Sequence, residues 1–402
     1  MSAPTATTQP AIRQVGPHRA AGALAPVLPG VPTPTMPGPR LFGLIRIVLI
    51  LLTLIATAVG VAATLAAEDT QHQSAVAMVH AQDLRDLRTA VAAAQATALA
   101  CLADPAAGTG ECPALESANQ AVDAALLASA ASAAQHTGVD KLTATATTLR
   151  HWQSAAILAV ATRDAQWTTG LTTGYDALAA DLFRATAGGS AGTTVSAMEP
   201  VAIVVAVIAL LAFLGALVVV ARRSHRVINI GLAVGLLAVI GIMSILGVHT
   251  GRSAAISAAD ARIAELGTAQ AAVWDARSAN LAGLLTPAQW PDLDAAARAD
   301  LTTAQSLLAP YPTAENRAAA LLNAQQQLTD ATDVATRAPL VLDATAWNSL
   351  TGTIADTTNS LRPDQTQLVI PALPYAIPLA GLAVVAIVAT LGGIHVRTEE
   401  YV

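Results

Sequence analysis

The two cysteines are the clearest candidates for covalent chemistry in this chain. Cys101 and Cys112 bracket the segment LADPAAGTGE, whose proline and glycines are typical of a turn. A disulfide here would close a short loop and stabilise the fold by about 3 kcal/mol. No histidine or third cysteine lies at a metal-ligand spacing, so we expect a disulfide, with two free thiols as the alternative.

A few cations and aromatic residues are candidate binding contacts. Arg150 and Trp152, in the sequence RHW, pair a cation with a ring in a way that suits a carboxylate-bearing ligand, although ordinary core packing is the simpler alternative. Gly108 lies in one predicted helix–helix turn, and Gln289 and Trp290 lie in another. These three are candidate contacts for a protein partner, since exposed aromatic residues often anchor interfaces; Trp290 could also simply close the end of a helix bundle.

The remaining candidates are basic or hydroxyl-bearing. Arg222, Arg223 and Arg226 lie in the sequence ARRSHRVI between two long apolar runs, where they would anchor topology and attract anionic lipid headgroups. Thr33 and Thr35, in the sequence PTPT, are candidate phosphorylation sites; a plain linker is the alternative.

Motifs for catalysis are missing from the sequence. It contains no P-loop and none of the patterns GxGxxG, HExxH, GxSxG or CxxC. The long apolar windows hold no Asp, Glu or Lys that could relay a proton or an ion. We therefore expect neither an enzyme nor a transporter, and no cofactor, metal or nucleic-acid partner.

Four apolar windows must position these residues. The chain is 54% hydrophobic with a mean hydropathy of +0.53, and each window is long enough to cross about 30 Å of hydrocarbon as a helix. A cleaved signal peptide is the alternative for the first window only. Gly231 and Gly235, one turn apart in the third window, predict close helix packing. The predicted transmembrane helices are 41–67, 201–221, 227–249 and 372–395.

The charges beside these windows predict an orientation. Residues 1–46 hold four arginines and no acid, and the loop 222–226 holds three more arginines. By contrast, residues 68–200 hold 13 acids and 6 bases, and residues 250–371 hold 12 acids and 7 bases. Positive-inside bias therefore places both termini, including the tail 396–402, in the cytoplasm of a plasma-membrane protein. The two long segments are then extracytoplasmic, where a disulfide is stable.

Both long segments are rich in alanine, with leucine and valine every three to four residues, and this periodicity predicts helices. Helices of this length joined by short turns are typical of four-helix bundles, and the first helix of each is expected to continue from its membrane span. The predicted breaks are 104–113, 135–141, a softer one at 168–174, then 284–291, 309–313 and 336–340. The sequence thus predicts an all-α membrane protein with four transmembrane helices and two extracytoplasmic four-helix-bundle domains. A disordered Pro/Ala/Thr-rich arm over 1–40 precedes them.

The order of span, long segment and span occurs twice, which predicts a tandem pseudo-two-fold repeat. A shift of 179 positions places LRTA at 87–90 opposite LGTA at 266–269. In the second copy three positions of the apolar stripe are polar, namely Gln270, Arg277 and Asn280. We interpret them as a stripe that drifts around the helix rather than as a buried polar site.

This architecture resembles two kinds of membrane protein. One span–bundle–span unit is similar to the sensor half of chemoreceptors and bundle-type sensor kinases, although the signalling domains of those families are missing here. The whole order of Pro-rich arm, two units and short tail, with arginine far outnumbering lysine, resembles the actinobacterial four-span membrane protein of the glutamine/aspartate-sensing protein kinase G pathway (GlnX-like). That resemblance implies an extracytoplasmic solute-binding protein and a cytoplasmic Ser/Thr kinase or adaptor as partners.

We therefore expect a non-enzymatic transmembrane signal transducer that senses the supply of amino acids and relays it inward. Two alternatives stay open. The first is a direct small-molecule sensor that holds its ligand between the bundles near Arg150 and Trp152. The second is an envelope scaffold or an accessory subunit of a transport or cell-wall complex.

Overall fold

The alanine-rich sequence folds into helices, and no strand occurs in the stretches that the structure describes. These stretches of the computed structural model are residues 38–104, 112–135, 139–189, 198–224, 229–331, 333–362 and 369–399. Alanine and leucine have high helix propensity, and valine and isoleucine are concentrated in the apolar windows, where a helix satisfies every backbone polar group internally.

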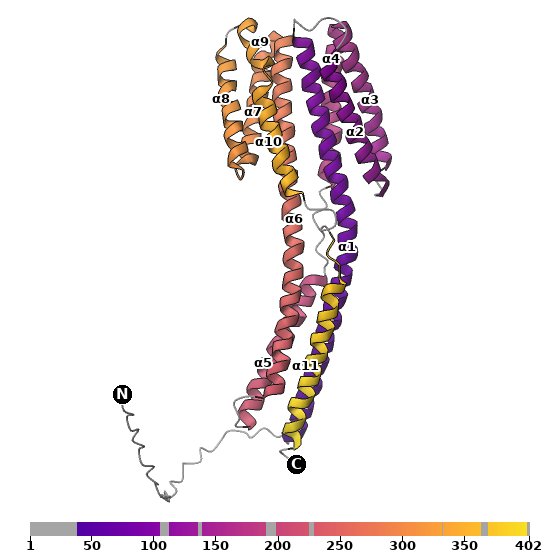
Figure 1. Ribbon diagram of the computed structural model, residues 1–402, viewed down its shortest axis with the longest axis vertical. Coiled ribbons are helices and arrows are strands. Elements are labelled where there is room, and N and C mark those ends of the chain that lie inside the picture. Colours follow the sequence, from indigo (N-terminus) through magenta and orange to yellow (C-terminus); the bar gives the residue numbers. More distant parts are fainter. Residues whose placement is uncertain are drawn as a thin grey trace, which may run out of the picture.

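Two long helices organise the molecule. Helix α1 (Gly38–Ala103) has 66 residues and helix α6 (Ile230–Leu285) has 56. Both run in one piece from the apolar end of the molecule to the opposite end (Figure 1). No proline interrupts either helix beyond the first turn, so nothing in the sequence forces a kink. The prediction that each apolar span continues as the first helix of the following segment is confirmed.

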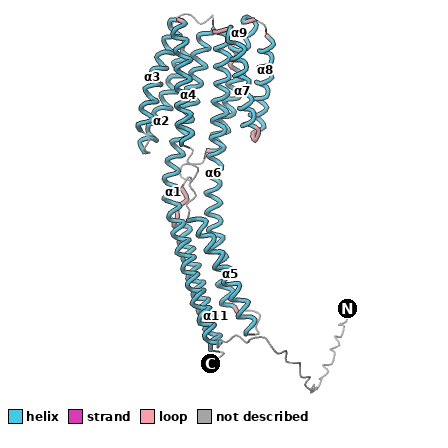
Figure 2. The backbone as a smooth tube through the Cα atoms, turned by 180° about the vertical axis from the view of Figure 1, so that it is seen from behind, coloured by secondary structure: helices cyan, strands magenta, loops and turns pink. Residues whose placement is uncertain are grey.

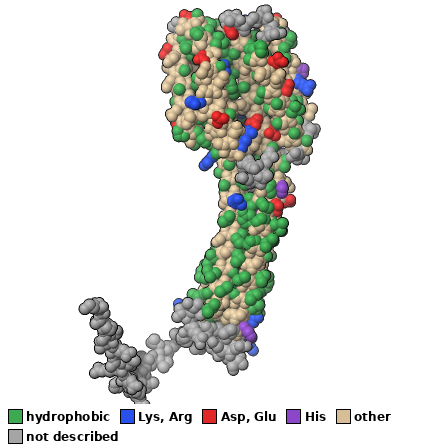
Figure 3. Space-filling view, in the orientation of Figure 1, with side chains coloured by type: hydrophobic (Ala, Val, Ile, Leu, Met, Phe, Trp, Pro, Cys, Tyr) green, Lys and Arg blue, Asp and Glu red, His purple; other side chains and the backbone are tan. Residues whose placement is uncertain are grey.

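Four helices are long and apolar enough to cross a membrane, which fits a multi-pass membrane protein. They are α1, α6, α5 (Met198–Ser224) and α11 (Leu373–Glu399). In this part of the molecule many large apolar side chains face outward, while alanines such as Ala56 and Ala206 lie inside together with Phe42, Phe213 and Leu379, an arrangement that suits a lipid environment. Apolar side chains cover the lower stalk in Figure 3, whereas acidic and basic groups gather on the broad head.

Close helix contacts in the apolar part depend on glycine. A Cβ atom on Gly231 would lie 2.5 Å from the Cα atom of Gly393 on α11, and one on Gly235 would lie 2.6 Å from the Phe213 ring on α5. Asn229 fastens the same contact, since its side-chain amide donates to the Gly393 carbonyl over 3.0 Å while its oxygen accepts from the Leu232 amide. The predicted close packing at the two glycines is confirmed.

The first helical group consists of the upper half of α1 and three shorter helices beside it (Figure 1). These are α2 (Pro113–Gln135), α3 (Val139–Thr162) and α4 (Ala165–Gly189). The predicted break at 168–174 is wrong, because α4 runs through it and buries Leu171 completely. The chain turns instead at Arg163, whose φ of 51° is left-handed.

The second helical group consists of the upper half of α6 and the helices that follow it. They are the short 3₁₀ helix η1 (Pro287–Gln289), α7 (Trp290–Leu308), α8 (Pro312–Asp330), α9 (Val334–Leu342) and α10 (Thr345–Leu361). The predicted break at 336–340 is wrong, because those residues form α9 despite Pro339. Asp333 caps this helix by accepting from the Thr336 amide over 2.7 Å, so α9 starts at Val334, before the predicted break.

The two helical groups lie side by side in both views (Figures 1 and 2). Their contact is apolar near the end away from the membrane helices, where Leu99 and Trp152 of the first group share one core with Leu281, Leu284 and Trp290 of the second. One continuous core of this kind makes the two groups a single head.

Polar contacts join α1 to the other half of the chain between the head and the apolar part. Arg85 and Asp260 form an ion pair of 3.2 Å between α1 and α6, with both side chains more than four-fifths buried. Closer to the membrane helices, the Gln71 amide donates to the Ser253 hydroxyl over 3.0 Å. These bonds fix the register of the two long helices against each other.

Candidate functional site

A cavity of about 680 Å³ opens between the two helical groups, and we call it the inter-group cavity. Its walls come from α1 and α4 of the first group and from α6, η1 and α7 of the second. The volume falls within the range of small-molecule sites. Elements far apart in the sequence meet here only because the two long helices pack against each other.

Carboxylates are the dominant charged groups of this cavity. Asp176 on α4, Asp275 on α6 and Asp300 on α7 all line it, and no Lys, Arg or His is among the lining residues that the structure describes. Burial raises the pKa of all three. For Asp300 the value reaches about 6, because the charge of Asp275 adds to the effect of burial.

Tyr175 and Asp275 form a direct bond across the boundary between the groups. The phenol of Tyr175, on α4, donates to Oδ1 of Asp275, on α6, at a separation of 100 residues. Burial raises the pKa of Tyr175 well above its ordinary value, so the phenol keeps its proton. This bond and the nearby positive charge of Arg88 both act to lower the pKa of Asp275, against the larger effect of burial. Of the three cavity carboxylates, Asp275 is therefore the one whose charge is partly compensated, by the Tyr175 phenol and by Arg88.

The other polar groups in the wall are hydroxyls and amides. Ser278 on α6 is 7% exposed, and its hydroxyl oxygen is buried without a hydrogen-bond partner in the described chain. A buried hydroxyl without a partner keeps its bonding capacity for a neighbouring group. Thr169, Thr172 and Thr173 add a hydroxyl-rich edge from α4.

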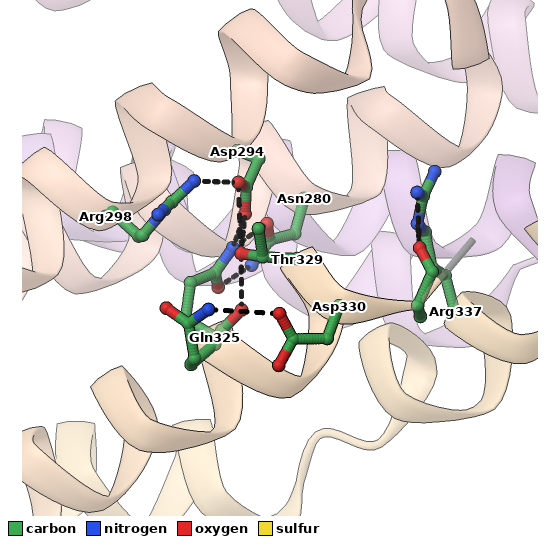
Figure 4. Close-up of polar contacts among 9 residues, drawn as sticks. Asn280, Asp294, Arg298, Gln325, Thr329, Asp330 and Arg337 are labelled. Carbon is green, nitrogen blue, oxygen red and sulfur yellow. Dashed lines mark hydrogen bonds and ion pairs between the residues drawn. The ribbon is translucent and has the colours of Figure 1, made fainter. Parts of the chain in front are cut away.

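A buried polar network stiffens the second group beside this cavity (Figure 4). Asn280 on α6 and Gln325 on α8 exchange two amide hydrogen bonds of 2.7 and 2.9 Å. Gln325 also donates to Asp294 on α7 over 2.7 Å, and the hydroxyl of Thr329 donates to the same carboxylate over 3.1 Å. Arg298 pairs with Asp294, which is 3% exposed. The network therefore ties three helices together and neutralises its own charge.

This network overturns the expected drift of the apolar stripe. Asn280 and Arg277 are buried, at 1% and 7% exposure, while Gln270 is half-buried. The reason is that α6 packs against both its own group and α1, and no position between 269 and 285 is exposed. The Arg277 guanidinium lies 5.7 Å from the Trp274 ring, and burial lowers its pKa.

Arg150 and Trp152 do not form one site. Trp152 is buried in the core, and its indole N–H donates to Gln95 over 3.1 Å. Arg150 is exposed and lines a surface depression between α2 and α3, together with Asp123. Successive positions on a helix point about 100° apart, which separates these two side chains. Only Gln95, the partner of Trp152, reaches the inter-group cavity.

The three candidate contacts for a protein partner, Gly108, Gln289 and Trp290, also differ in their surroundings. Trp290 is 5% exposed and packs on Gly283, with the Arg337 guanidinium 4.4 Å from its ring, so it is not an exposed contact. Gln289 is exposed and lies at the rim of the inter-group cavity. Gly108 lies outside the described residues.

Cys101 and Cys112 lie at disulfide distance, with 6.3 Å between their Cα atoms. The predicted pairing fits this geometry. Arg163, at the turn between α3 and α4, donates to the Asp104 carbonyl over 3.1 Å, which ties a second turn to the end of α1. The candidate disulfide therefore lies at a fixed corner of the head.

Of the basic and hydroxyl candidates, the structure describes the side chain of Arg222 alone. Arg222 is exposed near the end of α5. Arg223 belongs to the same helix, but its side chain is not described, and Arg226 lies outside the described residues. Thr33 and Thr35 also lie outside them.

Sequence reasoning missed a polar cluster where the apolar part meets the head. His249 on α6 and Glu199 on α5 are both buried, with 3.3 Å between Nδ1 and Oε1. Tyr375 on α11 packs edge-on against His249 at 5.1 Å and accepts a hydrogen bond of 2.9 Å from Arg252. Each residue lies at the edge of a predicted span, which is the signal that could have found the cluster.

Comparisons with known proteins do not assign this arrangement. No protein-family model, no curated protein and no solved structure matches the chain. Among the described residues, no group of three His, Cys, Asp or Glu side chains could hold a metal ion.

Proposed function

We propose that this chain is a transmembrane signal transducer without enzymatic activity. The observation that carries the proposal is that α1 and α6 each join the apolar part and the wall of the inter-group cavity in one helix. A helix without a hinge passes a tilt or a rotation along its length. A change in the spacing of the two groups would therefore reach the other end of both helices.

The direction of signalling follows from the proposed topology. Positive-inside bias supports a cytoplasmic location for both termini and for Arg222, with the head outside. Each half of the chain contributes one long helix, one shorter apolar helix and a helical group, which supports a duplicated pseudo-two-fold origin. We propose that the head responds to amino-acid supply and that a cytoplasmic Ser/Thr kinase or adaptor reads the inner ends.

Two inputs to the head are compatible with this role. One is an extracytoplasmic solute-binding protein that docks at the exposed tip around Gln289, as the GlnX-like resemblance implies. The other is a small molecule bound directly, which the inter-group cavity favours. In either case the signal requires that the partner bind two packings of the head with unequal affinity.

Photo-crosslinking in cells tests the transducer and separates its inputs. A crosslinker at Gln289 samples the tip, and one at Asn323, exposed on the flank of α8, is the matched control. An adduct with a solute-binding protein from the tip alone, varying with amino-acid supply, supports transduction through a docked protein. Adducts with cell-wall or transport proteins that ignore nutrient supply would overturn the transducer in favour of a scaffold. A tip without protein adducts favours the directly bound ligand.

A further inference from the structure

We propose that the inter-group cavity binds a small linear organic dication, an α,ω-diamine or a longer polyamine, between Asp176 on α4 and Asp300 on α7. The inference rests on the proposed function for its biological consequence, because a ligand held by both groups would set their spacing. The binding itself depends only on the residues of the cavity.

The charge of the wall selects for cations. Three carboxylates line the cavity without a basic side chain among the lining residues. Asp275 has a phenol as donor and Arg88 nearby, so its charge is partly compensated. Neither Asp176 nor Asp300 forms an ion pair with any side chain that the structure describes. Asp176 is exposed on α4 and Asp300 is half-buried on α7, so both charges are open to a ligand, and one with two ammonium ends would pair with both.

Ser278 supplies an independent sign of a ligand. Ser278 lines the cavity and is 7% exposed, and its hydroxyl oxygen lacks a partner within the described residues. An ammonium group carries up to three N–H donors, which is more than one carboxylate accepts in a single geometry. The Ser278 oxygen can accept one of these donors, which would remove the cost of leaving the hydroxyl unbonded.

Other ligand classes fit this wall less well. A metal ion needs several ligands around one point, and the described carboxylates do not converge in that way. An amino acid would bring a carboxylate into a wall without a basic partner. Arg88 cannot serve it there, because this guanidinium is not a lining residue and lies 5.3 Å from the Phe183 ring. The apolar lining from Leu99, Leu285 and Leu293 suits a methylene chain instead.

The pH dependence of binding follows from the groups around Asp300. The negative charge of Asp275 on α6 raises the pKa of Asp300. Asp176 and Tyr175 line the same cavity from α4, and the positive charge of Arg88 on α1 lowers the pKa of Asp275. The pKa of Asp300 is about 6, so this carboxyl is largely protonated at pH 5 and ionised at pH 7.5. A dication should therefore bind more tightly at pH 7.5 than at pH 5.

Calorimetric titration of the purified full chain in lipid nanodiscs tests the proposal. The probes are diamines with three to six methylene groups and spermidine, at constant ionic strength. We expect saturable binding with an optimum in chain length. Asp176→Asn and Asp300→Asn should each weaken it about tenfold or more. Asp292→Asn, on the exposed side of α7, is the matched control and should bind as the wild type does.

Three results would overturn the inference. They are the absence of saturable binding, equal affinity in the wild type and both cavity variants, and equal competition by a monoamine at the same charge concentration. None of these results would contradict the proposed function, because crosslinking from Gln289 in cells tests signal transduction whichever input the head uses. Conversely, a chain that binds diamines but gives only nutrient-independent scaffold adducts would keep the binding site and lose the transducer.

Discussion

Gly231 on α6 lies against Gly393 on α11 without a side chain between the two backbones. A Cβ atom on Gly231 would lie 2.5 Å from the Cα atom of Gly393, a separation that real Cβ atoms do not reach. The neighbouring Asn229 side chain bonds to the Gly393 carbonyl, so α11 cannot shift away without losing that bond. An added side chain at this contact between α6 and α11 would therefore clash with the backbone of the neighbouring helix.

Gly231→Ala should destabilise the protein for this reason. We expect the free energy of unfolding to fall by about 1–3 kcal/mol, the usual cost of overpacking. Gly215→Ala is the matched control, because a Cβ there meets no atom within 4 Å. Thermal unfolding in detergent, followed by circular dichroism, measures both variants. Equal transition temperatures for the two would contradict the close contact.

The Asn280–Gln325–Asp294 network should contribute strongly to the stability of the second group. Gln325→Ala leaves the buried Asn280 amide and Asp294 carboxylate each short of a partner, at a cost of about 2–3 kcal/mol. Gln326→Ala changes the same residue type one position along, where the side chain is exposed, and should stay within about 0.5 kcal/mol of the wild type. Denaturant titration of the two variants compares these values, and a similar midpoint for both would rule out the stabilising role.

Asp300→Asn should stabilise the protein only where the carboxyl is ionised. The pKa of Asp300 is raised to about 6 in the folded protein, so the folded state binds this proton more tightly than the unfolded chain. Stability is therefore lost as the pH rises from about 4 through 6. At pH 7.5 the variant should melt roughly 2–4 °C higher, for a gain near 1 kcal/mol in a partly solvated site.

At pH 4.5 the same substitution should bring little gain, because the wild-type carboxyl is then mostly protonated in the folded state. Asp292→Asn, exposed on the same helix, is the control for the loss of a negative charge. Scanning calorimetry at both pH values separates the cases. A gain of the same size at both values would show that Asp300 is not the titrating group.

The pair Cys101 and Cys112 can be tested without interference from other thiols, since the chain has two cysteines. A double Cys→Ser variant should lose about 3 kcal/mol of stability, and a reductant should lower the melting temperature of the wild type alone. Thiol titration of the denatured, unreduced protein should find no free thiol. Two titratable thiols in protein purified without reductant would exclude the bond.

The sequence was informative wherever one helix decides the outcome. An uncharged window of about 20 residues needs only its own backbone bonds to cross hydrocarbon, so the spans can be read directly. The absence of proline between Arg46 and Ala103 likewise predicts that one helix continues through the membrane boundary. The two cysteines bracket their own turn, so their proximity also follows from local sequence.

Sequence reasoning failed where two distant helices decide the outcome. From the pattern of one helix, Asn280 and Arg277 suggest a stripe that drifts. Only the packing of α6 against both α1 and its own group shows that these two positions are buried. The bond between Tyr175 and Asp275 spans 100 residues, and no local periodicity contains it. Leu171 keeps α4 helical through a Thr/Gly-rich stretch because its burial outweighs weak propensity.

The unbroken course of α1 gives the molecule a lever. Its 66 residues, at 1.5 Å each, make a rod of roughly 100 Å. On a rod of that length, a tilt of one degree moves the far end by about 2 Å, close to the size of helix shifts that switch other proteins. A displacement too small to disturb any hydrogen bond in the head would thus be large at the opposite tip, without a joint to absorb it.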